Sequence, residues 1–184
     1  MSFLKLISNF LPENMAYAHC DIPCGIYDPF RAQLAAHTII RMTELLAGIK
    51  PIRHPSTPLR TRAQGEREDP SASSGQAETK AEHDIARMTH VKEEHSDILE
   101  EELETLRNDY FKEEHFAKYP NLNELFVKTL KSAGKARQNI SLPDAEETLA
   151  GILEIAEIFF KTKDVEPIRV NTVYPTQREM VLYK

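Results

Sequence analysis

Residues 19–29 read HCDIPCGIYDP and contain both cysteines of the 184-residue chain. Cys20 and Cys24 stand four positions apart, and Pro23 with Gly25 supplies a turn that lets two thiolates close on one ion. A disulfide framework for a chain of this length would use more cysteines, spread more widely. The pair therefore indicates either a metal site or a small disulfide loop close to the N-terminus.

The donor atoms of this stretch suit a planar metal site. If the chain is cleaved after Ala18, His19 offers a free α-amine as well as its imidazole. The amide nitrogen between His19 and Cys20 then lies between that amine and the first thiolate, and Cys24 supplies a fourth donor. Two nitrogens and two sulfurs in a plane suit Ni(II) or Cu(II), whereas Zn(II) prefers a tetrahedron. Thiolates, an amide anion and an axial imidazole favour one-electron cycling of the metal.

Residues 1–18 are interpreted as a leader whose removal exposes His19. The sequence Ala-Tyr-Ala at residues 16–18 fits the small-residue pattern that signal peptidase reads. The apolar segment before it is short, and Pro-Glu-Asn at residues 12–14 interrupts it. Removal inside the cell is therefore favoured over secretion.

The rest of the chain predicts helices. Asp28-Pro29 is a helix start, with an acidic cap and proline at the first position. Helices are expected at residues 29–47, at 83–111, from Asn121 to Gly134, and from about Pro143 with Ser141 as its cap. In the first helix, the apolar face is expected at Phe30, Leu34, Thr38, Met42 and Leu45. The simplest fold is all-α: an up-down four-helix bundle over residues 29–163 with an N-terminal metal-binding hook at 19–28.

Two segments lack this pattern. Residues 49–82 contain four prolines and almost no hydrophobic residues before the next helix, which predicts a disordered linker within the bundle. Residues 164–184 have Val, Tyr and Pro character without a clear period, which predicts an irregular C-terminal tail.

Composition narrows the partners. The formal net charge is −6 and no basic stripe is present, which argues against nucleic acid. No run of about 18 apolar residues exists, so a membrane-spanning helix is not expected. A cytoplasmic location is expected, or an organelle if the source is eukaryotic.

Residues 19–29 resemble, almost position for position, the metal hook of nickel-type superoxide dismutases, whose pattern is HCDxPCGxYDP. A second stretch, DYFK at residues 109–112 with His115-Phe116 and Lys-Tyr-Pro at 118–120, resembles the signature that this family carries between its later helices. The resemblance covers about residues 13–48 and 84–163.

The resemblance implies an enzyme that converts superoxide to oxygen and hydrogen peroxide by alternating Ni(III) and Ni(II), with one nickel ion per subunit. It implies that His19 provides the amine and the axial imidazole, that Cys20 provides the amide and a thiolate, and that Cys24 provides the second thiolate. It also implies a homohexamer. A leader peptidase and a nickel delivery factor are expected as partners.

The same resemblance implies a pocket around the metal. Asp21 and Tyr27 border the place where superoxide approaches, and Tyr110 hydrogen-bonds to the hook. Some members of the family tether the axial imidazole with a glutamate in the first helix and an arginine in the second. The matching positions here are Ala35 and His95, so either the tether is looser or His95 replaces it.

Two other functions stay open at the level of the sequence. A nickel or copper binding protein without turnover would need only the amine, amide and thiolate donors. A secreted helical interaction module would instead contain a Cys20–Cys24 disulfide and no metal.

Overall fold

The structure is a computed structural model that describes residues 25–49 and 72–184. In the second range it describes side chains from residue 79 onward. The predictions for the leader, for residues 19–24 of the hook and for linker residues 50–71 lie outside the described residues.

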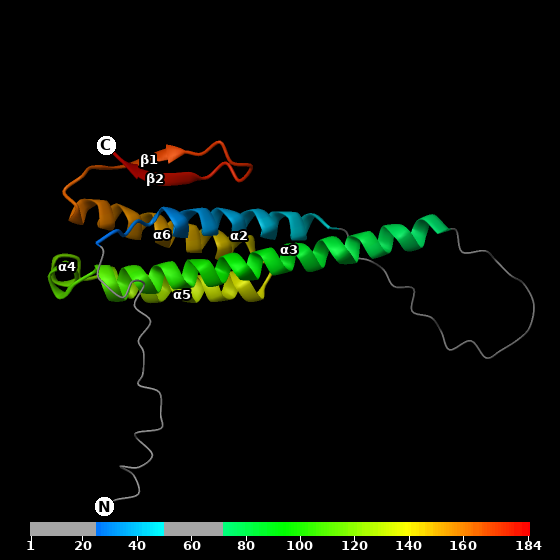
Figure 1. Cartoon of the computed structure of the whole chain (residues 1–184), viewed down its shortest axis with the longest axis horizontal. Coiled ribbons are helices and arrows are strands. Elements are labelled where there is room, and N and C mark those ends of the chain that lie inside the picture. Colours follow the sequence, from blue (N-terminus) through cyan, green and yellow to red (C-terminus); the bar gives the residue numbers. More distant parts are fainter. Residues whose placement is uncertain (1–24, 50–71) are drawn as a thin grey trace, which may run out of the picture.

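The described residues form a bundle of four long helices, α2 (Phe30–Gly48), α3 (Ala72–Thr105), α5 (Leu122–Gln138) and α6 (Leu142–Thr162). Contacts run from α2 to α3, α3 to α5, α5 to α6 and α6 back to α2, which closes a ring. Successive helices run in opposite directions (Figure 1). The predicted up-down four-helix bundle is therefore confirmed.

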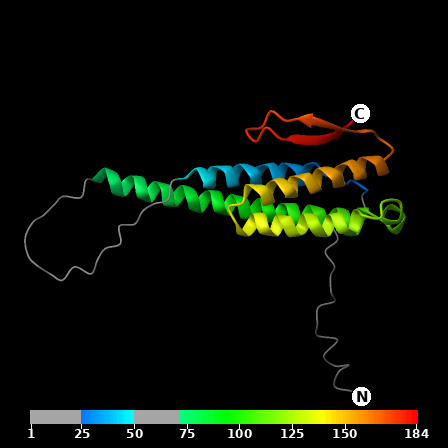
Figure 2. The same ribbon diagram turned by 180° about the vertical axis from the view of Figure 1, so that it is seen from behind.

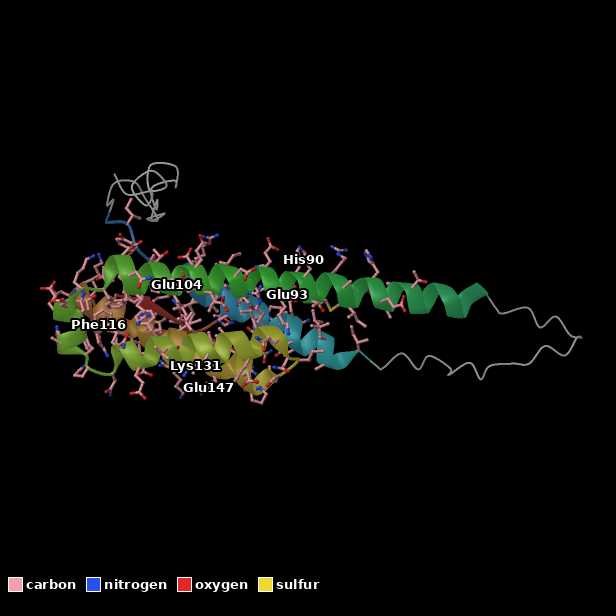
Figure 3. The ribbon with its side chains drawn as sticks, turned by 90° about the horizontal axis from the view of Figure 1, so that it is seen from below. His90, Glu93, Glu104, Phe116, Lys131 and Glu147 are labelled. Atoms are coloured by element: carbon pink, nitrogen blue, oxygen red, sulfur yellow. The ribbon has the colours of Figure 1, made fainter. Side chains whose placement is uncertain are left out.

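The core lies where the four helices face one another, and large apolar side chains from every helix fill it. The fully buried ones include Ile39, Ile40, Leu99, Leu103, Phe126, Ile152 and Ile155. Charged side chains such as Glu93, Glu104, Lys131 and Glu147 lie on the outer faces (Figure 3). This division is what burial of apolar surface produces in a helix bundle.

The buried face of α2 differs from the predicted one. Small residues and two isoleucines face the core, namely Ala32, Ala35, Ala36, Ile39 and Ile40. The predicted stripe is only half-buried, and Phe30 is 42% exposed. The alanines let α2 approach its neighbours closely, so the larger Leu34 and Met42 side chains are left at the edge of the bundle.

Helices α5 and α6 approach each other closely at Gly151. A Cβ atom on Gly151 would lie 2.1 Å from Oγ1 of Thr129, so no larger residue fits there without movement. The hydroxyls along this contact find partners: Thr129 donates to the Leu125 carbonyl, Ser132 donates to the Thr129 carbonyl, and Thr148 lies within hydrogen-bond distance of both Asp144 O and Ser132 Oγ. The contact is therefore tight although it contains polar groups.

The start of α3 corrects the linker prediction. The helix begins at Ala72, so residues 72–82 are helical and not part of a disordered linker. This segment is rich in Ala, Glu, Gln and Lys, which are good helix formers. Because the rest of α3 is held by the bundle, these residues only propagate an existing helix, which costs much less than starting a new one. The first turns of α3 extend beyond the end of α2 (Figure 1).

The ends of α5 and α6 were predicted with mixed success. Ser141 caps α6 as expected, because its hydroxyl accepts a hydrogen bond from Asp144 N. By contrast, α5 continues through Gly134 to Gln138, and Asn121 makes no side-chain cap. Lys92 of α3 explains the later end, since its buried ammonium donates to the carbonyls of Ala136 and Asn139 at 2.9 and 2.7 Å.

The predicted irregular tail is wrong. Residues 164–184 contain an antiparallel hairpin, β1 (Pro167–Asn171) and β2 (Glu179–Tyr183), with Arg169 opposite Val181. The hairpin lies over α2 and α6 in both views (Figures 1 and 2). No helix within residues 25–49 or 72–184 combines the length and apolarity needed to cross a membrane.

Two buried polar side chains of α2 hold this hairpin in place. Gln33 pairs with Val181 as a strand residue would: its amide nitrogen donates to Val181 O at 3.1 Å, and its oxygen accepts from Val181 N at 2.7 Å. His37 accepts from the Thr176 hydroxyl at 2.8 Å and donates to the Glu179 carbonyl at 3.2 Å. A two-stranded hairpin is marginal alone, so this docking is what stabilises it.

Candidate metal-hook anchor and substrate site

Five aromatic rings gather at the end of the bundle where α2 begins and α6 ends. We call this cluster the aromatic end and define it by Tyr27, Tyr110, Phe111, His115 and Phe159. A short helix, α4 (Glu113–Lys118), which was not predicted, carries His115 and lies at the same end (Figures 1 and 3).

A widened turn at the end of α3 places two of these rings. Residues Leu106–Tyr110 form the π-helical turn η1, and Phe111 N donates to Leu106 O at 2.9 Å. The extra residue in such a turn changes the direction of the side chains that follow it. Phe111 is buried against Phe126, whereas Tyr110 is half-buried and contacts Tyr27.

The hydroxyl of Tyr110 has a defined partner. It lies 2.6 Å from Oγ1 of Thr162, and that hydroxyl donates its own hydrogen to the Phe159 carbonyl. Tyr110 must therefore be the donor in its bond to Thr162. Burial raises the pKa of Tyr110, and the hydrogen bond to Thr162 only partly opposes this rise. The phenol is thus neutral at physiological pH.

The stem of the predicted hook is described and lies at this end. The ring centroid of Tyr27 is 5.5 Å from that of Tyr110, and the planes are tilted by 53°. Gly25 adopts a positive φ of 72°, which favours glycine, and the Asp28 carboxylate accepts from Phe30 N at 2.6 Å. The chain therefore enters α2 through a turn whose aromatic residue is held by the bundle.

His115 also packs against Tyr110. The two rings are nearly parallel, with centroids 5.7 Å apart and an interplanar angle of 11°. Its Nδ1 accepts from Lys112 N at 3.0 Å, so a neutral ring carries its hydrogen on Nε2.

His95 lies elsewhere, in a groove of about 500 Å³ between α2, α3 and the turn of the hairpin. Ala35 also lines this groove, together with Leu34, Met42, Ile98 and residues 174–176. The Nδ1 hydrogen of His95 goes to the Val91 carbonyl at 2.9 Å, which leaves Nε2 as the acceptor of a neutral ring. Ala35 and His95, the two positions that differ from the family pattern, therefore line the same groove.

The structure brings the predicted site residues together in two groups. Tyr27 meets Tyr110 at the aromatic end, and Ala35 meets His95 in the groove. His19, Cys20, Asp21 and Cys24 lie outside the described residues. Among the described residues, no group of three or more His, Cys, Asp or Glu side chains could hold a metal ion.

Sequence reasoning missed Thr162 and Lys163. Lys163 Nζ lies 4.8 Å from the centroid of the Tyr110 ring. Their only sequence signal is their position at the end of the apolar stripe of α6. A contact with Tyr110, 52 positions away, is not a local property of the chain.

Known proteins resemble this chain over most of its length. The family model described as nickel-containing superoxide dismutase matches residues 14–71 and 65–163, so the hairpin lies outside the match. Superoxide dismutase [Ni] of Streptomyces coelicolor is 30% identical over 154 residues, which cover 84% of this chain and 95% of the relative. The Streptomyces seoulensis protein of the same name is 27% identical with the same coverage.

Solved structures agree with these matches. The native nickel superoxide dismutase structure at 1.30 Å has a TM-score of 0.58 and 30% identity, covering 79% of this chain and 99% of its own. A structure of the nickel-containing enzyme with ligation of the oxidized state has a TM-score of 0.60 and 27% identity, with the same coverage. The chain belongs to the nickel-containing superoxide dismutase family, and it is an enzyme that acts on superoxide and uses nickel.

Proposed function

We propose that His19, Cys20 and Cys24 hold one nickel ion, and that the aromatic end fixes the hook that carries them. The observation that carries this proposal is the contact between Tyr27 and Tyr110. Tyr27 follows Cys24 by three positions, so a ring held by the bundle restricts where the second thiolate can lie.

The residues of the hook fit nickel by their donor chemistry. Two thiolates, an amine and an amide nitrogen would form a soft donor set of the kind that suits nickel, and the His19 imidazole would be a further donor. Six residues precede Gly25 up to His19, and a fully extended chain of that length spans about 20 Å. Tyr27 of the aromatic end and Arg31 of the groove follow Gly25 by only two and six positions, so both places lie near the stem of the hook along the chain. When bound, nickel supplies the one-electron redox chemistry that dismutation requires.

The protein residues are proposed to position the substrate and manage protons. Tyr27 and Asp21 border the pocket where superoxide approaches. Tyr110 stays neutral because burial raises its pKa, and its hydrogen is committed to Thr162. Tyr110 therefore acts by holding Tyr27 in place, and it does not itself give up a proton at physiological pH.

His95 is proposed to take the place of the tether on the His19 imidazole. Ala35 leaves space in the groove where a longer side chain would stand, and Nε2 of His95 is available as an acceptor. A single imidazole would orient the His19 ring more weakly than a glutamate–arginine pair would.

Assembly and processing complete the proposal. The half-buried apolar side chains of Leu34, Met42 and Ile98 on one side of the bundle support a homo-oligomer, proposed to be a hexamer. We further propose that a leader peptidase removes residues 1–18, that a delivery factor supplies nickel, and that the enzyme acts in the cytoplasm or in an organelle of a eukaryote.

The position of cleavage gives the sharpest test. In the intact chain the nitrogen of His19 is an amide and cannot act as an amine ligand. Chains that begin at Ala18, His19 and Cys20 are made, loaded with nickel and assayed for superoxide decay. Only the chain that begins at His19 is expected to turn over. Comparable activity from the Ala18 chain or from the intact chain would contradict the proposed ligand set, and nickel binding without turnover would indicate a metal-binding protein only.

A further inference from the structure

Lys163 lies over the aromatic end with its charge uncompensated. Its ammonium nitrogen is 4.8 Å from the centroid of the Tyr110 ring and 5.6 Å from that of Phe159. Within residues 25–49 and 79–184, it forms no ion pair with a carboxylate. The rings attract the ammonium through their quadrupoles but leave its full charge in place.

The end of α6 fixes this lysine. Lys163 N donates to Phe160 O at 3.0 Å, and Asp164 then takes a left-handed φ of 58°. Val165 N returns to the same Phe160 carbonyl at 3.2 Å, which closes the turn that leads into β1. Thr162 and Lys163 therefore both contact Tyr110 from the end of α6. Thr162 contacts the Tyr110 hydroxyl, and Lys163 lies over the Tyr110 ring.

We propose that Lys163 steers the superoxide anion to the aromatic end. The chain has a formal net charge of −6, which repels an anionic substrate at long range. A cation that forms no ion pair with a carboxylate and lies beside Tyr110 opposes this repulsion locally, where the proposed site needs it. Two other lysines of this region contact other groups and not the Tyr110 ring: Lys112 Nζ donates to Asp109 O at 2.6 Å, and Lys118 lies over Tyr119. This inference rests on the proposed function, which puts the nickel site at the aromatic end.

The test compares three variants of the nickel-loaded chain that begins at His19. Lys163→Met removes the charge but keeps a chain of similar length over the ring, and Lys163→Arg restores the charge. Lys161→Met is the matched control, because it removes the same charge two residues earlier on the exposed side of α6. The second-order rate constant for superoxide decay is measured at about 10 mM and about 0.5 M salt.

Lys163→Met is expected to lower the rate constant about two- to five-fold at low salt, the effect of one unit charge a few ångströms away in water. The difference should vanish at high salt, and Lys163→Arg and Lys161→Met should behave like the wild type. A purely structural role for Lys163 would not change the salt dependence. The proposal is overturned if Lys163→Met and Lys161→Met show the same rate constant and salt dependence.

A second measurement separates this idea from the proposed function. Azide, a small monovalent anion, is titrated into the full 1–184 chain without nickel, and the ring resonances of Tyr110 are followed by NMR. Binding is expected to weaken several-fold in Lys163→Met and to be unchanged in Lys161→Met. Equal shifts in all three proteins would contradict the steering role even if the enzyme proved inactive, whereas failure of turnover alone would count against the ligand set.

Discussion

Tyr110 donates a hydrogen bond of 2.6 Å to Oγ1 of Thr162, which joins the π-helical turn η1 to the last turn of α6. The bond connects the second sequence signature of the family to the point where the family match ends. The ring that contacts the stem of the hook is thus fixed from a helix that lies far away in the sequence.

Removing this bond should cost modest stability and more activity. Tyr110→Phe loses one hydrogen bond, worth about 1 kcal/mol in the free energy of unfolding. Turnover should fall further, because the ring that contacts Tyr27 is no longer fixed at its hydroxyl. Denaturant titration and superoxide decay measure the two effects. Thr162→Val is the reciprocal control and should give the larger loss of stability, since it leaves the Tyr110 hydroxyl without its partner. Two variants with unchanged activity would contradict the positioning role.

Loss of either thiolate should abolish the metal site. Cys20→Ser and Cys24→Ser replace a soft donor by a hydroxyl, which is a poor ligand for nickel. Metal analysis and superoxide decay are both expected to fall to background. His19→Gln keeps the amine and loses only the imidazole, so nickel should be retained while turnover falls. Retention of most activity in either serine variant would refute the assignment.

His95 should affect turnover more than metal content. If it orients the His19 imidazole, His95→Ala should lower turnover several-fold with nickel still bound. The double change Ala35→Glu with His95→Arg introduces the pair that some members of the family carry, and turnover should recover. A His95→Ala enzyme that equals the wild type would show that His95 does not tether the His19 imidazole.

Gly151 should tolerate no side chain. A Cβ atom there would lie 2.1 Å from Oγ1 of Thr129, so Gly151→Ala is expected to cost about 1–3 kcal/mol of stability through overpacking. Gly134→Ala is the matched control, because it lies within α5 and a Cβ atom there meets nothing within 4 Å. That change should stabilise the protein by up to about 1 kcal/mol. Thermal or denaturant unfolding of both variants tests this contrast, and equal midpoints would contradict it.

The docking of the hairpin should weaken in acid. Burial lowers the pKa of His37, the nearby Arg178 lowers it further, and the hydrogen bond to Glu179 partly opposes them. The unfolded chain, with a histidine pKa of about 6.5, therefore takes up the proton at a higher pH than the folded protein does. The stabilising contribution of neutral His37 is present above about pH 6.5 and is lost as the pH falls toward the pKa of His37 in the folded protein. Unfolding free energies between about pH 5.5 and 8 should show this slope.

His37→Gln provides the control for that slope. An amide can still pair with Thr176 and Glu179 but does not titrate, so the difference between wild type and variant isolates His37. An identical pH dependence in the two proteins would show that another group is responsible. Hydrogen exchange in β2 should report the same transition, because Gln33 and His37 hold that strand.

Local signals in the sequence determined the parts of this protein that depend on neighbours a few residues away. Ser141 with Pro143 starts α6, Asp28 with Pro29 starts α2, and the apolar periods specify four helices. The proposed donor set at residues 19–24 would also be local, since chelation by an amine, an amide and two thiolates needs only adjacent residues and one turn. These features follow from backbone geometry and capping, which act over about four positions.

The tertiary structure decided what depends on distant partners. The hairpin at residues 167–183 forms because Gln33, 148 positions from Val181, completes its hydrogen bonds. The extra turns of α3 follow from a helix that the bundle already holds, and α5 passes Gly134 because Lys92 satisfies its last carbonyls. Tyr110 meets Thr162, and Gly151 meets Thr129, only once the helices pack. Such contacts depend on the approach of whole elements, which residue periodicity does not encode.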